Sequence, residues 1–521
     1  MHEKADEESV RLAELIAALS LGIDLGFGQP MEHVLRQCWI AVRVADHLGL
    51  DERERSTVYY TALLINVGCH TDAHEQAKWF GDDIAFKSEK YLYPLHGVRS
   101  AVAGLRKLGS GRPLLQRFRI GLSFALSGRK EFDGMIARHA AMARLLAREV
   151  GLSEAVQDAV GASYEQWDGR GWPGALSGEA VPLAARISQL AEFVEVANRS
   201  GGVGAAVELA RGLAGSQFDP GVAASFCEAA GDILDGVDGA RTWDQVIAAE
   251  PVLDRPLTDA ELDGALGAVA DFVDLKSPCT LGHARNVAQL AGEAGDRLGL
   301  DDVALRTLRR AGLAHGLGRL GVSNAIWDKP GPLGLGEWER VRLQPHLTER
   351  MLCQSPALAT IGALAAQVRE RLDGSGYPRG LAGHAISLSA RILAAADVYQ
   401  AMVEPRPYRP ARDLADAAAE LRAEVRAGRL DGDAAEEVLA AAGHRARTRR
   451  ARPAGLTERE IDVLRLVARG MSSKDVAATL VISPKTARNH IEHIYAKAGV
   501  TSRVEASLFA IRYGLHDALS A

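Results

Sequence analysis

Arg488 and Asn489 are neighbours in a segment whose spacing predicts a short helix. An arginine can donate two hydrogen bonds to the edge of a guanine, and an asparagine can pair with the edge of an adenine. Three apolar residues at helical spacing would face inward and leave both side chains outward: Ala487, Ile491 and Ile494. The pattern suits a helix that reads the major groove of DNA, although such a face on a lone helix is more often simply solvated.

The residues before this helix predict the elements needed to hold it in a groove. Thr457 and Glu460 have the spacing of a capping box at the start of a first helix, and Gly470 ends that helix. Caps of the same kind precede the second and third helices: Ser472 or Ser473, and Ser483 with Pro484 at the first helical position.

Over all four predicted helices the chain resembles the C-terminal helix-turn-helix of the LuxR/NarL/FixJ family, with the sequence LTEREIDVLRLVARGMSSKDVAATLVISPKTARNHIEHIYAKAGVTSRVEA. The resemblance implies that Arg488 and Asn489 read bases, that Glu460 braces the first helix, and that residues 503–513 form a dimer seam. It assigns phosphate or positioning contacts to four further residues: Lys485, Thr486, His490 and Lys497. Glu492 departs from the family pattern. It could accept from a cytosine or repel the DNA backbone, which leaves the recognised sequence open.

Charge is divided unevenly along the chain. Residues 444–521 contain 14 lysines and arginines against 7 aspartates and glutamates, whereas the remainder contains 47 against 60. A basic tail on an acidic body suits a DNA-binding end. Residues 444–455, rich in arginine and alanine, are predicted to be a basic linker that either lies along DNA phosphates or acts as a solvated tether.

Bulk composition predicts a soluble, cytoplasmic protein of three or four domains. The 521 residues are 47% hydrophobic and 25% charged, which is ordinary for soluble proteins. The five cysteines are scattered without metal-binding spacing, so we expect reduced thiols. We find no signal-peptide core and no apolar run of bilayer length, so no membrane partner is expected.

A long repeat precedes the basic tail. The sequence DGRGWP at 168–173 returns as DGSGYP at 373–378, a shift of 205 residues, and the match continues to Ile187 and Ile392. A repeat of this length indicates two copies of a domain, and apolar residues with a period near 3.6 predict a helical bundle for each. We predict an all-α chain with the first copy at 1–240, the second at 255–443 and the DNA-binding domain at 456–521.

The second copy resembles the HD-GYP branch of the HD phosphohydrolase superfamily, through pieces such as GHARNVAQLA, LAHGLGRLGVSNAIWDKPGPL and ERLDGSGYPRGL. Enzymes of that branch hold two or three metal ions and split phosphodiesters, notably cyclic dinucleotides, with metal-activated water. The resemblance implies surviving ligand positions at His283, His315 and Asp397. Other family positions have lost their expected residues: Gly316, Arg319, Gln344, Val368, Arg369 and Gln400. We therefore expect no bound metal and no catalytic residue, with the histidines as buried structural residues.

The first copy departs further from the family pattern. His33 keeps the leading ligand position, so it is expected to be a vestige of a metal site. The other positions fall on residues of different chemistry: Ile65 and Asn66, Ser163 and Tyr164, and Glu192.

A separate group, His70-x-Asp72-x-His74 with Asp82 and Asp83 beyond it, could bind a metal in principle. Alternate residues do not share a helix face, so we favour a local explanation. In this interpretation Asp72 forms a capping box with Glu75, and His74 lies in the first turn of the helix.

These observations predict a transcription regulator whose two inactive HD-GYP-like domains sense a signal, dimerise or bind a partner. The expected partners are double-stranded DNA, a second copy of the chain and RNA polymerase. Arg319, Arg369 and Arg371 lie near the altered pocket in the family alignment, so a nucleotide or other anionic ligand could bind there.

The alternative is a working HD-type phosphodiesterase joined to a DNA-binding domain. It would need a divalent metal such as manganese or iron, held by an unusual set of ligands: His283, His315, His346 and Asp397.

Overall fold

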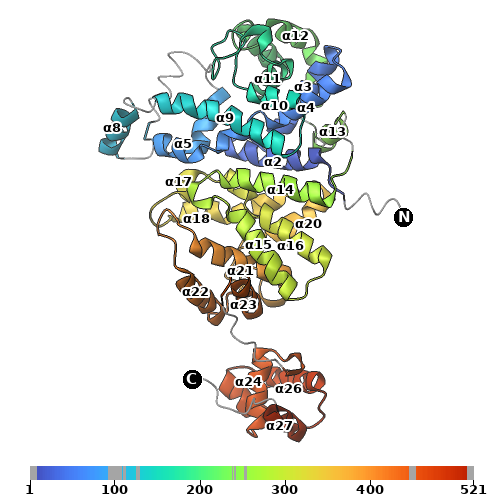
Figure 1. Ribbon diagram of the computed structural model, residues 1–521, viewed down its shortest axis with the longest axis vertical. Helices are drawn as coiled ribbons and strands as arrows, with labels where there is room; N and C mark the ends of the chain where they lie inside the picture. Colours follow the sequence, from blue (N-terminus) through green and yellow to red (C-terminus); the bar gives the residue numbers. More distant parts are fainter. Residues whose placement is uncertain are drawn as a thin grey trace. The chain divides into compact units, whose positions relative to one another are not determined.

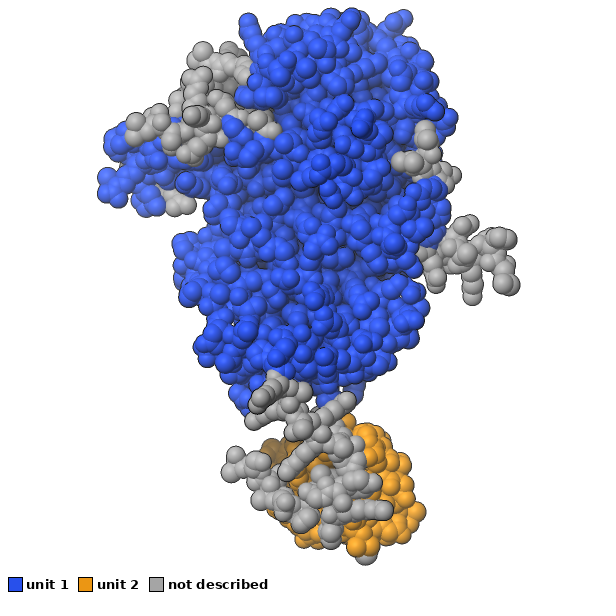
Figure 2. All heavy atoms as spheres, in the orientation of Figure 1, with its two compact units in different colours: residues 1–444 blue, residues 445–521 orange. Residues whose placement is uncertain are grey.

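In the computed structural model all elements of regular secondary structure among the described residues are helices; these residues are 9–91, 108–109, 113–124, 129–237, 239, 242–251, 255–444 and 453–512 (Figure 1). Within them, β-type pairing is limited to isolated bridges. The chain divides into two compact units, residues 1–444 and 445–521 (Figure 2). The all-α prediction is confirmed, whereas most of the predicted basic linker, residues 445–452, lies outside the described residues. No described helix is both long and apolar enough to cross a membrane.

The first copy supplies the early helices of the first unit. They are α2 (Leu12–Gly26), α3 (His33–His47), α4 (Glu52–Leu64), η1 (Val67–His70), α5 (Ala73–Phe80), α6 (Asp83–Lys87), η2 (Ser88–Tyr91), α8 (Leu114–Ser123), α9 (Arg129–Glu149), α10 (Glu154–Gly161), η4 (Gly178–Ala180), α11 (Leu183–Leu213), α12 (Pro220–Leu234) and α13 (Thr242–Ala248). Helix α11 is kinked at Gly202, where φ is 72°.

The second copy follows in the same unit. Its helices are α14 (Asp259–Asp274), η5 (Pro278–Thr280), α15 (His283–Arg297), α16 (Asp302–Ala314), η6 (Leu317–Gly321), α17 (Asn324–Trp327), α18 (Leu335–Arg342), α19 (Gln344–Leu352), α20 (Pro356–Ala365), η7 (Gly383–Ala385), α21 (Leu388–Val403), α22 (Leu414–Arg426) and α23 (Gly432–Ala441).

The two copies repeat each other's hydrogen bonds as well as part of their sequence. Asp24, at the end of α2, accepts from the backbone N–H of Val34 at 3.0 Å. Asp274, at the end of α14, accepts from the N–H of Ala284 at 2.8 Å. Each carboxylate thereby fixes the start of the next helix, which places a histidine at its first position.

The repeated glycine-proline loop is built in the same way in both copies. Gly169 and Gly374 have φ values of 74° and 80°, the left-handed region that favours glycine. The second glycine of the motif has a different purpose, since a Cβ at Gly376 would lie 2.4 Å from the backbone nitrogen of Arg371. Glu370 accepts hydrogen bonds from two N–H groups of the loop and closes it.

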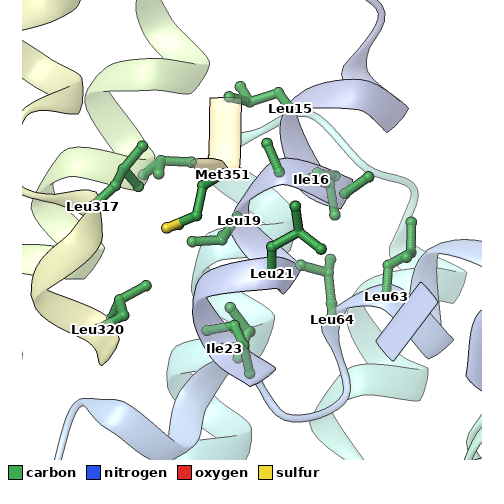
Figure 3. Close-up of a cluster of buried hydrophobic side chains, with 14 of the residues drawn as sticks. Leu15, Ile16, Leu19, Leu21, Ile23, Leu63, Leu64, Leu317, Leu320 and Met351 are labelled. Atoms are coloured by element: carbon green, nitrogen blue, oxygen red, sulfur yellow. The ribbon is translucent and has the colours of Figure 1, made fainter. Parts of the chain in front are cut away.

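One hydrophobic cluster runs through both copies. Helix α2 is buried on almost every side, and Figure 3 shows Leu317, Leu320 and Met351 of the second copy beside Leu19 of α2. Leu320 and Met351 are fully buried, so losing either side chain would cost a few kcal/mol. The two copies therefore form one folded body, and the domain boundary near residues 240–255 stays a prediction.

The second unit is a small helical domain with its own core. It contains η8 (Pro453–Gly455), α24 (Glu458–Ala468), α25 (Ser473–Leu480), α26 (Pro484–Ala498) and α27 (Arg503–Arg512). The predicted caps are confirmed at Thr457, Ser472 and Ser483, each of which accepts a backbone N–H of its helix. Ala487 and Ile494 are buried and Ile491 is partly buried, as the apolar spacing predicted.

Candidate metal and DNA-contact sites

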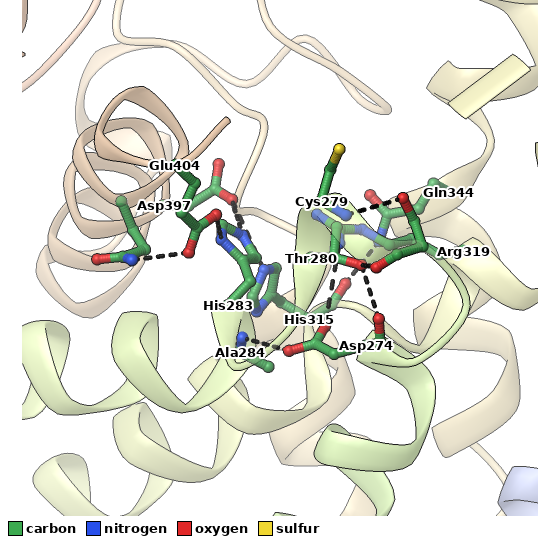
Figure 4. Close-up of polar contacts among 12 residues, drawn as sticks. Asp274, Cys279, Thr280, His283, Ala284, His315, Arg319, Gln344, Asp397 and Glu404 are labelled. Atoms are coloured by element: carbon green, nitrogen blue, oxygen red, sulfur yellow. Dashed lines mark hydrogen bonds and ion pairs between the residues drawn. The ribbon is translucent and has the colours of Figure 1, made fainter. Parts of the chain in front are cut away.

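Three donor atoms converge in the second copy. His283 begins α15, His315 directly follows α16, and Asp397 lies within α21. The Oδ1 atom of Asp397 is 3.2 Å from Nε2 of His283 and 3.6 Å from Nε2 of His315 (Figure 4). All three residues are buried, and one donor atom from each lies within 4.8 Å of the others. This is the one group of its kind among the described residues.

The rest of the second copy holds both imidazoles in this orientation. Nδ1 of His283 is 2.8 Å from Oε2 of Glu404, and Nδ1 of His315 is 2.6 Å from the carbonyl oxygen of Gly312. Nε2 of His315 has no hydrogen-bond partner in the described part of the chain. Burial lowers the pKa of His315, which favours the neutral imidazole that a metal requires.

A basic side chain forms an ion pair with the other oxygen of the Asp397 carboxylate. Nη1 of Arg369 lies 2.8 Å from Oδ2 of Asp397. Burial raises the pKa of Asp397, but Arg369, His283 and His315 outweigh burial and hold that pKa well below its usual value. Asp397 is therefore an anion, with Oδ1 toward the histidines and Oδ2 toward the guanidinium.

The donor set fits one divalent ion and does not fit two. Two imidazole nitrogens and one carboxylate oxygen are ligands that manganese, iron and zinc accept. Gly316 has no ligating atom, and the amide nitrogen of Gln344 donates to the carbonyl oxygen of His315 at 2.5 Å. His346, which the phosphodiesterase alternative included, is exposed and does not belong to the converging group.

The three arginines expected to line an anion pocket have different surroundings. Arg369 is paired with Asp397, as described above. The buried Arg319 lies 4.0 Å from Oδ1 of Asp274. Arg371 donates to the backbone carbonyl oxygen of Glu370 at 2.8 Å.

In the first copy a lysine contacts two of the residues that align with the family's metal-ligand positions, Asn66 and Glu192. Nζ of Lys90 is 2.6 Å from Oε1 of Glu192 and 3.0 Å from Oδ1 of Asn66. Tyr91 donates to the same glutamate oxygen at 2.8 Å. Burial raises the pKa of Glu192, but Lys90 outweighs it and holds that pKa below its usual value. This site does not fit a metal, because the ammonium group already compensates the carboxylate.

His33 is also engaged by protein groups. Its Nδ1 is 2.5 Å from Oε2 of Glu195, and its Nε2 is 3.3 Å from the hydroxyl of Tyr91. Arg36 donates to the other oxygen of Glu195 at 2.8 Å. Both nitrogens of His33 therefore have partners within the protein.

Sequence reasoning missed one histidine of the first copy. A Cβ at Gly68 would lie 2.1 Å from the carbonyl oxygen of His139, and a Cβ at Gly318 would lie 2.0 Å from that of Gln344. His139 is thus the counterpart of Gln344, and the 205-residue shift applied to Gln344 would have found it. Because His33 and His283 are 250 residues apart, an insertion of about 45 residues separates the early and late positions of the first copy.

The cluster of His70, Asp72 and His74 does not converge. Nε2 of His70 contacts the carbonyl oxygen of Phe272 at 3.2 Å, and Nδ1 of His74 contacts Asp328 at 2.8 Å. Asp72 pairs with His139 at 2.8 Å and makes no capping hydrogen bond. The predicted capping box is therefore wrong, because a buried histidine brought by α9 recruits the carboxylate.

The candidate DNA-contact residues lie on or beside one face of α26. Arg488, Asn489 and Lys485 are exposed, and within the described residues neither Arg488 nor Asn489 forms a hydrogen bond or ion pair. Thr486 is exposed but its hydroxyl contacts that of Ser483 at 2.8 Å. His490 is half-buried.

Lys497 takes part in the packing of the small domain. Its Nζ lies 2.8 Å from Oε2 of Glu460, and the same glutamate oxygen accepts from the backbone N–H of Thr457. Glu460 therefore ties the start of α24 to α26.

Comparison with known proteins identifies both parts of the chain. Residues 129–222 and 267–434 match the HD domain family, and residues 454–510 match the family of bacterial regulatory proteins, luxR family. Over 408 residues the chain is 33% identical to 3'3'-cGAMP-specific phosphodiesterase 3 of Vibrio cholerae, covering 77% of this chain and 88% of that protein. The chain belongs to the HD domain family. It also carries a luxR-family helix-turn-helix, so both predicted resemblances are confirmed.

Further relatives resemble the HD region. A cyclic di-GMP phosphodiesterase of Thermotoga maritima is 33% identical over 158 residues, covering 30% of this chain and 42% of that protein. The crystal structure of a cyclic GMP-AMP specific phosphodiesterase in V. cholerae (V-cGAP3) has a TM-score of 0.58 and 29% identity, and the match covers 84% of this chain and 98% of that chain.

Proposed function

We propose that this chain is a DNA-binding regulator whose HD region is a metal-dependent phosphodiesterase with a single-ion site. The observation that carries the proposal is the convergence of Nε2 of His283, Nε2 of His315 and Oδ1 of Asp397. A relative that matches most of this chain is named as a phosphodiesterase specific for 3'3'-cGAMP, and this favours the enzymatic alternative over an inactive HD region. Cyclic dinucleotides are the substrate class that follows.

In this proposal each residue of the site has a separate task. His283 and His315 hold the ion, with Glu404 and the Gly312 carbonyl fixing the imidazole planes. A bound divalent ion supplies a water of lowered pKa and neutralises phosphate charge. Arg369 is 22% exposed at its side chain, so its guanidinium can receive non-bridging phosphate oxygens while it stays beside Asp397.

A second candidate is an HD region that binds a cyclic dinucleotide without cutting it. The pairing of Arg369 with Asp397 at 2.8 Å favours this candidate, because a cation beside the ligand carboxylate competes with a metal. Gly316 favours it as well, since the family's bridging carboxylate is missing at that position.

The small domain would bring the HD region to DNA. Arg488 and Asn489 would read bases, and Lys485, Thr486 and His490 would contact phosphates. Lys497 would act through its ion pair with Glu460, which fixes the angle of α26. Helix α27 would form the seam of a dimer on paired half-sites, and RNA polymerase would be a further partner.

Metal content and turnover test the proposal together. The full chain, purified from manganese- or iron-supplemented cells, is assayed for bound metal and for hydrolysis of 3'3'-cGAMP and cyclic di-GMP by chromatography. The variant His315→Ala should lose both properties, and the matched variant His346→Ala should keep both because His346 is exposed. Saturable dinucleotide binding in calorimetry without turnover identifies the second candidate. Absence of metal, turnover and binding overturns both.

A further inference from the structure

A cavity lies at the junction of the two copies, within the first unit. Its volume is about 730 Å³, a size typical of cavities that hold small-molecule ligands. One wall comes from α5 and α6 of the first copy, and the other comes from α17 and the residues that follow it in the second copy. His74 contacts Asp328 between these walls, and Figure 1 shows α5 beside α17. His283, His315 and Asp397 are not among the described residues that line the cavity, so it is separate from the candidate metal site.

Two basic side chains on α5 face this cavity. His74 and Lys78 both line it, and residues four apart in a helix lie one turn apart on the same face. Lys78 is exposed, and its Nζ lies 4.9 Å from the centre of the Trp79 ring. Within the described residues Lys78 forms no hydrogen bond or ion pair. Its ammonium group is therefore free to donate to a ligand.

Asp328 prepares His74 as a second donor. Nδ1 of His74 is 2.8 Å from Oδ2 of Asp328, and this hydrogen bond raises the pKa of His74, although burial acts against it. A raised pKa favours the imidazolium, in which both ring nitrogens carry a proton. Since Nδ1 is directed to Asp328, Nε2 remains to donate, and it has no partner in the described part of the chain. The charge of Lys78 opposes that of His74, so an anion beside both would relieve their repulsion.

The carboxylates that line the cavity are already hydrogen-bonded within the protein. Asp328 also accepts from the hydroxyl of Ser277 at 2.6 Å. Glu337 accepts from Nζ of Lys329 at 2.6 Å, and Asp82 accepts two N–H groups at the start of α6. The groups left to meet a ligand are therefore the two donors on α5. A ligand with anionic oxygens matches them.

Other lining residues suit a planar ring. Phe80 and Phe86 line the cavity, and their rings are stacked with centroids 3.9 Å apart and planes 8° apart. Such rings offer a flat apolar surface on which a heterocycle can pack. The fully buried Asn324 also lines the cavity, and its Oδ1 has no hydrogen-bond partner among the described residues. A ring that carries an N–H group would supply the missing donor.

We propose that this cavity is a binding site for a nucleoside monophosphate. The phosphate accepts hydrogen bonds from Lys78 and His74, and the base packs near Phe80 and Phe86. Because the ligand contacts both copies, its binding stabilises their junction. The site acts independently of catalysis in the HD region, since its residues are separate from the candidate metal site.

Calorimetric titration of the full chain tests the proposal. The probes are adenosine monophosphate and guanosine monophosphate, each up to about 1 mM. Adenosine and inorganic phosphate are titrated separately as the two halves of a nucleotide. We expect saturable binding of at least one nucleotide and at least about tenfold weaker binding of each half. Absence of nucleotide binding overturns the proposal, as does inorganic phosphate that binds as tightly as the nucleotides.

Two lysine variants locate the phosphate. Lys78→Ala removes the free ammonium group and should weaken nucleotide binding at least about tenfold, whereas Lys78→Arg keeps the charge and should retain most of the binding. The matched variant Lys474→Ala changes an exposed lysine of the small domain and should leave binding unchanged. Unchanged binding in Lys78→Ala overturns the proposal. If Lys78→Ala does not fold, as judged by circular dichroism, His74→Gln decides in its place by the same criterion.

A variant of the candidate metal site separates the two sites. His315→Ala should keep nucleotide binding, because His315 is not among the described residues that line the cavity. If a folded His315→Ala protein loses binding while Lys78→Ala keeps it, the nucleotide occupies the candidate metal site and the proposal is overturned.

Discussion

Asp83 and Asn324, 241 residues apart in the chain, are joined by a hydrogen bond of 2.8 Å from the backbone N–H of Asn324 to Oδ1 of Asp83. Ser323 donates to the same oxygen at 2.8 Å. The other oxygen lies 3.1 Å from Nζ of Lys87 and 3.5 Å from Nζ of Lys276. Asp83 is fully buried. One carboxylate thus contacts two lysines and caps α17 across the junction of the two copies.

Replacing Asp83 should destabilise the first unit strongly. Asp83→Asn keeps an acceptor for Asn324 but leaves two buried lysines without their anion, which costs about 3 kcal/mol in the free energy of unfolding. Urea unfolding followed by fluorescence measures this loss. The control is Asp46→Asn, whose partner Arg55 is exposed, and it should cost under about 1 kcal/mol. Equal losses in the two variants would contradict the prediction.

Glu195 should make stability depend on acid pH. Burial raises the pKa of Glu195, but His33 and Arg36 hold it at about 2, against 4.5 for an ordinary glutamate. This depressed pKa stabilises the fold above pH 4.5 and loses that contribution as the pH falls toward 2. Urea midpoints measured between pH 5 and pH 3 should therefore fall less steeply in Glu195→Gln than in the wild type. The exposed Glu149→Gln should keep the wild-type slope.

Adding one carboxylate should strengthen the proposed metal site. Gly316 has helical dihedral angles, and a Cβ there would meet no atom closer than 3.8 Å. Gly316→Asp can therefore place an oxygen ligand beside His315 without a clash, and we expect the affinity for Mn²⁺ to rise at least about tenfold. Calorimetric titration measures it. Gly316→Asn has nearly the same shape without the charge, and an equal gain in that variant would refute the explanation.

The two kinds of DNA contact should be separable by mutation. Arg488→Ala should relax the preference at one base pair by about 1–3 kcal/mol, because it removes a contact to a base edge. Lys485→Ala should weaken binding to all sequences alike. It should also reduce the slope of log affinity against log salt concentration by about 1, the value for one phosphate contact. Binding to a library of sites at two salt concentrations distinguishes these outcomes. A uniform loss for Arg488→Ala would remove it from the set of base readers.

The turn between α25 and α26 contains a strained valine. Val481 has φ 54° and ψ 48° and is 91% exposed. A β-branched residue in this region is strained, whereas asparagine tolerates it. Val481→Asn should stabilise the small domain by about 1 kcal/mol, seen as slower amide exchange in α25 and α26 of the full chain. Val481→Ala should gain less, because alanine lacks the short polar side chain with which asparagine can hydrogen-bond locally in this region.

Local sequence was sufficient for the helices, for the three caps of the small domain and for locating the three residues that converge in the second copy. The capping patterns at Thr457, Ser472 and Ser483 depend on residues three apart, so no tertiary contact is needed to recognise them. His283, His315 and Asp397 could be placed because enough of the neighbouring sequence still resembles the family, although Gly316 and Gln400 have lost the expected residues. The apolar character of α2 on nearly all its sides also contained a signal, since such a helix must be buried between two bodies.

Contacts between residues that are far apart in the sequence could not be predicted from local sequence patterns. Lys90 meets Glu192 after 102 residues, and Asp83 meets Asn324 after 241. Asp72 has the spacing of a capping box, yet it pairs with His139. The carboxylate stabilises this buried imidazole more than it would stabilise an exposed helix end. The insertion in the first copy changed the alignment and concealed His139.

Because of Lys90, the first copy does not need a metal ion to balance the charge of Glu192, whereas the proposed site in the second copy does need an ion. Its ammonium group is covalently part of the chain and lies 2.6 Å from Oε1 of Glu192, whereas the ion proposed at His283, His315 and Asp397 would have to be taken up from solution. Chelation or iron starvation would then remove the proposed ion from the second copy and leave the charge balance of the first copy unchanged. With the proposed single-ion site, a change in metal supply would therefore act on the second copy alone.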